Sequence, residues 1–219
     1  MSNILLSATH VIFGVASLAG GLTAILARKS KGLHTRAGML YTIGMYGTGI
    51  TGVVMSVIRF NPFLLSVGLF ALYLTYSGKV SIDLFRRKET WNPDWKQLAP
   101  AVMAIAVAAF MILWPMSQML ISGTFFVPVL AVFGLILMLN AIQDFRLLSG
   151  KANLYPRNRN FLVAHIGKMG GAYISTLTAF LVNNVSTDPA WVSWLLPTLV
   201  GTPLIVLSIR NWKSKLRMA

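Results

Sequence analysis

A few ionisable side chains lie within long apolar stretches, and these residues could do chemistry. His34 and His165 each stand near the start of such a stretch, and Lys168 follows His165 on the same helical face. An ionisable group inside a bilayer is costly, so each is a functional candidate. The two imidazoles could relay protons near neutral pH, or ligate one b-type haem iron axially. The structural alternative is that both rings bond only to backbone or lipid headgroups.

Two carboxylates stand near the ends of apolar stretches. Asp83 and Asp144 would sit near helix C-termini, where the helix dipole disfavours negative charge, so each needs a nearby cation. Lys79 precedes Asp83 by one helical turn, and an ion pair is the simplest interpretation of that spacing, with Arg86 as the other candidate cation. For Asp144 the candidate cations are Arg146 and Lys168. The alternative for Lys168 is that its side chain reaches out to the interface.

Two tyrosines extend this set, because each follows one of the two histidines by about two helical turns. We expect the tyrosines, histidines and carboxylates to form a polar cluster in the cytoplasmic half of the protein. It is interpreted as a ligand-binding or proton site, with a purely structural network as the alternative. Its members are His34, Tyr41, Asp83, Asp144, His165, Lys168 and Tyr173.

Other chemistries lack the residues they need. The chain has no cysteine, which excludes thiolate nucleophiles, cysteine-ligated zinc and iron–sulfur clusters. Its five acidic residues leave little material for paired-carboxylate catalysis, and no zinc-protease or serine-hydrolase motif is present. With three histidines, at most one bis-histidine haem is feasible, and His10 is interpreted as a core residue. We therefore expect a protein that is not an enzyme.

The elements that position these residues are apolar helices. Of 219 residues, 56% are hydrophobic and 11% charged, and the mean hydropathy is +0.69. Soluble domains carry roughly 25% charged residues, and a membrane crossing takes about 20 apolar residues. The sequence predicts an all-α bundle of seven transmembrane helices in one domain, 1–219. The predicted spans are roughly 3–27, 36–58, 62–84, 97–120, 124–147, 160–183 and 190–210.

Helix starts and membrane orientation can also be predicted. Asn61-Pro62, Asn92-Pro93-Asp94 and Asp188-Pro189 have the composition of helix N-termini. Basic residues lie in the first, third and fifth connections and after the last helix, which predicts an outside N-terminus and an inside C-terminus. The formal charge of +14 is explained by this pattern and by contact with anionic lipid headgroups, without nucleic acid. The basic groups begin at Arg28, Arg86, Arg146 and Arg210.

The chain also contains a short internal similarity. In both halves a histidine is followed by a basic residue, a glycine and a tyrosine, near the start of a glycine-rich helix. We interpret units 1–88 and 124–212 as a parallel repeat joined by helix 97–120, the arrangement of small SWEET-type transporters. The glycine-rich helices 36–58 and 160–183 are expected to pack centrally, since small residues allow close helix contact in lipid.

Three stretches, 31–41, 165–180 and 194–205, the last with Pro197 and Pro203, resemble a family of bacterial multi-pass membrane proteins whose function is unknown. The resemblance covers most of the chain. It implies a bacterial origin and, with the spans, the inner (cytoplasmic) membrane. It implies no activity, cofactor or catalytic residue.

Three functions fit these observations. The leading hypothesis is a small transporter or ligand-binding protein that uses the polar cluster. The first alternative is a one-haem electron-transfer protein with His34 and His165 as axial ligands, for which haem b is the cofactor. The second alternative is a structural or accessory subunit of a larger membrane complex.

Overall fold

The computed structural model describes residues 2–29, 32–90, 94–122, 127–149, 158–189 and 191–217, and this part of the chain is helical without any strand. The seven predicted helices are confirmed. They are α1 (Ser2–Leu26), α2 (Leu33–Ile58), α3 (Pro62–Arg86), α4 (Trp95–Ser122), α5 (Val127–Ser149), α6 (Arg159–Asn184) and α7 (Trp191–Arg217).

The helices differ in how well they suit a bilayer. Within the described residues, six helices are long and apolar enough to cross a membrane, and α6 is the exception. With 26 residues α6 is about 39 Å long, so its length is sufficient. Its composition is more polar because it carries His165, Lys168 and a terminal pair of asparagines. A polar inner helix can be shielded from lipid by its neighbours.

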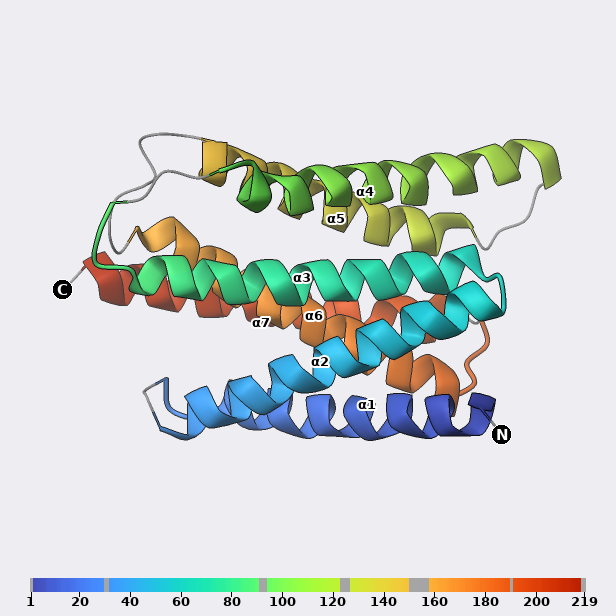
Figure 1. Cartoon of the computed structure of the whole chain (residues 1–219), viewed down its shortest axis with the longest axis horizontal. Helices are drawn as coiled ribbons and strands as arrows, with labels where there is room; N and C mark the ends of the chain where they lie inside the picture. Colours follow the sequence, from blue (N-terminus) through green and yellow to red (C-terminus); the bar gives the residue numbers. More distant parts are fainter. Residues whose placement is uncertain are drawn as a thin grey trace.

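The helices run up and down along one axis, and the two chain termini lie at opposite ends of the bundle (Figure 1). The C-terminal ends of α1, α3 and α5 and the N-terminal ends of α2, α4 and α6 lie at the same end as the C-terminus of α7, which we call the basic end. The described basic residues near this end include Arg28, Lys29, Arg36, Arg86, Arg87, Lys88, Lys96, Arg146, Arg159, Arg210 and Lys213. Lys31, Lys151 and Arg157 lie outside the described residues.

Helix α3 is the central element, because it packs against α2, α4, α5 and α6. Helices α1 and α2 form one close pair and α4 and α5 another, while α6 packs between α3 and α7 (Figure 1). We expected α2 and α6 to be central, but each makes its closest contacts elsewhere, α2 with α1 and α6 with α3. The repeat stays a prediction. The largest buried cluster includes Phe70, Leu74, Met111, Phe133 and Leu137.

Two of the predicted helix starts have the expected caps. The Asn61 side chain accepts a hydrogen bond from the Leu64 amide at 3.0 Å, and Pro62 opens α3. At the start of α4, the Gln97 amide donates to the Asp94 carboxylate at 3.2 Å, and the Asp94 amide donates to the Gln97 side chain at 3.1 Å. This reciprocal pair is a capping box and fixes the position of Gln97. Residues 92 and 93 of the predicted signal lie outside the described residues.

Glycine explains the close approach of α1 and α2. A Cβ atom at Gly44 would lie 2.8 Å from the Ser17 amide nitrogen and 2.9 Å from the Phe13 carbonyl oxygen, both backbone atoms of α1. Backbone cannot move aside as the end of a flexible side chain can. Gly38, on the same helix, would place its Cβ in open space, with nothing within 4 Å.

These two glycines give a matched prediction. Gly44→Ala should destabilise the protein by about 1–3 kcal/mol, because the added methyl group forces α1 and α2 apart. Gly38→Ala should be neutral or stabilise by about 0.5–1 kcal/mol, since alanine is the better helix residue. Unfolding of the detergent-purified variants by increasing SDS, followed by tryptophan fluorescence, measures both. Equal effects of the two substitutions would contradict the steric explanation.

Candidate functional site

The centre of the site is an ion pair inside the bundle. Lys168 of α6 donates to Asp144 Oδ1 of α5, and the two residues are only 1% and 5% exposed. The structure thus identifies Lys168 as the cation that Asp144 was expected to need. The alternative in which Lys168 extends to the membrane interface is wrong, because its ammonium group points into the bundle.

Helix α3 completes the pair with two hydroxyl groups. The Tyr73 hydroxyl donates to Asp144 Oδ2 at 2.6 Å, and the Ser77 hydroxyl donates to the same oxygen. Tyr73 and Ser77 are one turn apart on the buried face of α3. Three helices therefore converge on one carboxylate. An ion pair is tolerated in an apolar interior when further hydrogen bonds satisfy the remaining acceptor positions of its carboxylate, as the two hydroxyl groups do here.

Sequence reasoning missed Tyr73 and Ser77, since neutral residues in an apolar run do not stand out. A signal was present: Tyr73, Ser77 and Ser81 recur every four residues and form a polar stripe along one face of α3. The stripe faces α5 because of the rotation of α3 about its own axis. That rotation is set by packing against the neighbouring helices, which the sequence of α3 alone does not give.

His165 lies beside this site without entering it. Its Nδ1 is 2.8 Å from the Gly78 carbonyl oxygen of α3. A carbonyl oxygen can only accept, so Nδ1 carries the hydrogen and Nε2 is the acceptor of the neutral ring. Gly78 also has a packing role, because a Cβ there would lie 2.8 Å from Met169 Sδ and 3.3 Å from Lys168 Cβ. The absent side chain allows α6 to bring Lys168 up to α3.

Tyr41 and Tyr173 form a second cluster, whose hydrogen bonds among the described residues do not involve Asp144 or Lys168. Their ring centroids are 6.1 Å apart. The Tyr41 hydroxyl donates to the Met169 carbonyl at 3.3 Å, and the Tyr173 hydroxyl to the Leu18 carbonyl at 3.5 Å. These contacts join α1, α2 and α6. The expected meeting of the two tyrosines occurs, but as a packing contact between helices.

His34 and Asp83 lie at the basic end, outside the buried group. His34 Nδ1 is 2.9 Å from the Ala24 carbonyl oxygen at the C-terminus of α1, where Lys29 also donates at 2.7 Å. Partial burial there lowers the pKa of the Lys29 ammonium group. Asp83 pairs with Lys79 at 2.6 Å, as the spacing predicted, and both side chains are about half exposed. His34 and Lys29 thus bind a carbonyl group left free at the end of α1, and Asp83 and Lys79 neutralise each other at the surface.

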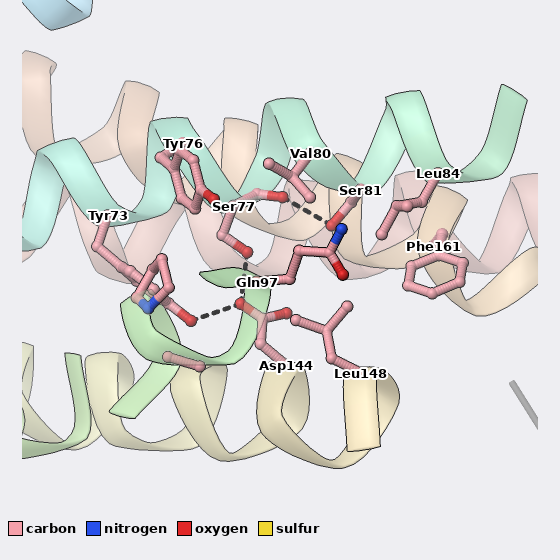
Figure 2. Close-up of a pocket in the computed structure, with 12 residues that line it drawn as sticks. Tyr73, Tyr76, Ser77, Val80, Ser81, Leu84, Gln97, Asp144, Leu148 and Phe161 are labelled. Carbon is pink, nitrogen blue, oxygen red and sulfur yellow. Dashed lines mark hydrogen bonds between the residues drawn. The ribbon is translucent and has the colours of Figure 1, made fainter. Parts of the chain in front are cut away.

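A small cavity adjoins Asp144 (Figure 2). Its volume of about 20 Å³ suits one water molecule. Its wall combines polar groups of α3, α4 and α5 with apolar side chains of α3 to α6. The lining residues are Tyr73, Tyr76, Ser77, Val80, Ser81, Leu84, Gln97, Pro100, Ala101, Asp144, Leu148 and Phe161.

No family model, curated protein or solved structure matches this chain. The resemblance to bacterial membrane proteins therefore stays a prediction, and the site has to be interpreted from its own geometry.

The geometry gives the haem hypothesis no support. His34 bonds to a carbonyl of α1 and His165 to a carbonyl of α3, and neither lines the cavity. His10 is partly buried, and its Nδ1 lies 3.0 Å from the Thr51 hydroxyl.

The hydrogen bond from Tyr73 can be tested against a tyrosine of the same cavity. Tyr73→Phe should lower the free energy of unfolding by about 1.5–3 kcal/mol, the typical contribution of a hydrogen bond to a charged group. Tyr76→Phe removes a hydroxyl group for which the described residues show no bond to Asp144, and should change stability much less. SDS unfolding of both variants is the measurement. A larger loss in Tyr76→Phe would mean that Tyr73 is not an important partner of the carboxylate.

Proposed function

We propose that this chain is an integral membrane protein that crosses the bilayer seven times, with its basic end on the cytoplasmic side. The six apolar helices and the length of α6 support this topology. The gathering of arginine and lysine at one end of the bundle supports the orientation, because positively charged connections are retained in the cytoplasm. The bacterial inner membrane is the proposed location.

We infer further that the protein is a small proton-coupled transporter. The observation that carries this inference is the buried Asp144–Lys168 pair, with hydroxyl groups from α3 and a cavity beside it. Lys168 lies about 13 Å along α6 from its first residue, well inside the hydrocarbon depth. Ionisable groups at such depth are costly, and in membrane proteins they commonly mark proton or substrate pathways.

The pair suggests how a proton could be coupled to movement. When Asp144 is protonated, Lys168 remains as a buried charge without a counterion, a state that costs several kcal/mol. The bundle then favours a conformation in which Lys168 meets water or an anion. Since the basic end raises the local concentration of anions, small anionic solutes are the first substrates to test.

The deciding experiment uses protein reconstituted in liposomes that contain a pH-sensitive dye. We expect solute-dependent proton movement with at least one member of a panel of small anions, amines and sugars, and no such movement in protein-free liposomes. If a broad panel gives no flux from stable, correctly inserted protein, the transport proposal is wrong. The ion pair would then be structural, as expected of an accessory subunit.

A further inference from the structure

We infer that the cavity beside Asp144 is a water-filled entry route that opens toward the basic end alone. The inference deepens the proposed function, because a proton site needs access to water on a defined side. The ligands assigned to the cavity are a water molecule and the proton that it delivers. Three observations support this inference. They are the position of the cavity, the apolar packing on its far side, and the unused hydrogen-bond acceptor position of the Asp144 carboxylate.

The cavity reaches from Asp144 to the ends of four helices. Leu84 is within one turn of the end of α3, and Leu148 of the end of α5. Gln97 is within one turn of the start of α4, and Phe161 of the start of α6. All four of these helix ends lie at the basic end (Figure 1). Little more than one layer of side chains therefore separates the cavity from that surface.

The other side of Asp144 is closed by close-packed apolar side chains. Ala141 and Leu137 precede Asp144 on the same face of α5, and both are fully buried. Met111 of α4 and Leu74 of α3 belong to the same buried cluster. Interiors of this kind are packed as densely as organic crystals and leave no room for water. Asp144 therefore stands at the boundary between a polar cavity and a dry core.

Asp144 has hydrogen-bonding capacity to spare on the cavity side. A carboxylate offers about four acceptor positions, and Lys168, Tyr73 and Ser77 use three of them. Oδ2 accepts from both hydroxyl groups and Oδ1 only from Lys168, whose bond Figure 2 does not draw, so Oδ1 keeps one acceptor position at the wall of the cavity. A buried water needs about 2–4 polar partners, and Asp144, Ser81 and Gln97 are available on the cavity wall.

Proton delivery requires a single transfer. A hydronium ion formed in the cavity gives its proton to the Asp144 carboxylate, the water stays, Asp144 becomes neutral, and Lys168 remains an ammonium ion. The titratable groups that face Asp144 are Lys168 from α6 with Tyr73 and Tyr76 from α3. Helix α4 contributes only Gln97, Pro100 and Ala101 to the cavity, none of which titrates.

Because the chain has no cysteine, access can be measured with single introduced thiols. Ser81→Cys places a thiol in the cavity wall, and Ser66→Cys is its matched control on the same helix. Both serines are nearly fully buried, at 3% and 2% exposure, and both donate to the carbonyl four residues earlier. Silver ion is the probe, since it is close to water in size and blocks thiols.

The variants are placed in sealed vesicles, and Ag⁺ is added to one side at a time. The thiol groups that have not reacted with Ag⁺ are then counted by labelling with maleimide in SDS. Lys88→Cys and Arg59→Cys, at opposite ends of the bundle, report which side Ag⁺ has reached. We expect Ser81→Cys to react about tenfold or more faster from the basic end than from the other side. Ser66→Cys, one turn from the other end of α3, should react slowly from the basic end, since buried sites react only through local opening.

A second pair of variants covers the case in which Ser81→Cys does not fold. Ala101→Cys lines the cavity from α4, whereas Ala108→Cys lies in the dry core of the same helix. Equal rates of Ala101→Cys or Ser81→Cys from the two sides, or rates no faster than their controls, would overturn the inference. One-sided access without any flux would instead remove only the transport proposal, because the thiol measurement requires no transport.

Discussion

Lys168→Met should be among the most destabilising single substitutions in the protein, lowering the free energy of unfolding by about 3–5 kcal/mol. The substitution leaves the Asp144 carboxylate buried and charged, with only the hydroxyl groups of Tyr73 and Ser77 as partners. Two neutral hydrogen bonds do not replace a counterion in an apolar interior. SDS unfolding in detergent, followed by tryptophan fluorescence, measures the loss.

The double variant Asp144→Asn/Lys168→Met separates charge from packing. It removes both charges and keeps the side-chain volumes close to those of the native pair, so stability should return to within about 1–2 kcal/mol of the wild type. Lys79→Met, which breaks the exposed pair with Asp83, should cost less than about 1 kcal/mol. If the double variant is as unstable as Lys168→Met alone, the unpaired charge is not the cause of the loss.

The second large effect concerns transport. The Asp144→Asn/Lys168→Met double variant should lose proton-coupled flux by about a hundredfold or more, because an asparagine at position 144 cannot take up the proton. Since this variant is expected to fold, the loss cannot be assigned to a collapsed protein. The measurement is dye-reported proton movement in proteoliposomes that contain equal amounts of each variant.

A matched control is available in the other lysine–aspartate pair. Asp83→Asn/Lys79→Met removes the same two charges from a half-exposed position at the basic end. Its flux should stay within about twofold of the wild type, because exposed pairs contribute little. If both double variants reduce flux equally, the effect follows from the loss of surface charge, and the buried pair is not the proton site.

Much of the fold follows from the sequence, because the apolar stretches are long and their limits are chemically marked. The helix start at Asn61 was predictable from a side chain that can cap and a proline that follows it. The pair of Lys79 and Asp83 was predictable for a similar reason, since both residues lie on one helix at fixed geometry. Such local features depend on residues a few positions apart.

The site was predictable only in part. Asp83 and Asp144 have similar sequence surroundings, yet one is exposed and the other is held by three helices. The difference comes from the rotation and packing of α3, α5 and α6. The same cause explains Gly44, which belongs to a glycine-rich helix expected to pack centrally but faces the α1 backbone. Helical periodicity does not fix which neighbour a face meets.

The gathering of basic residues at one end of the bundle has an electrical consequence. Moving one positive charge across a membrane potential of 100 mV requires about 2.3 kcal/mol of work. Carrying the many arginines and lysines of that end through the membrane would therefore cost tens of kcal/mol before any desolvation is counted. With the basic end on the negative side of an energised membrane, as proposed, the voltage holds this end in place. If the site opens alternately to the two sides of the membrane, the opening must then come from small displacements around Asp144 and Lys168, while the basic end stays in place.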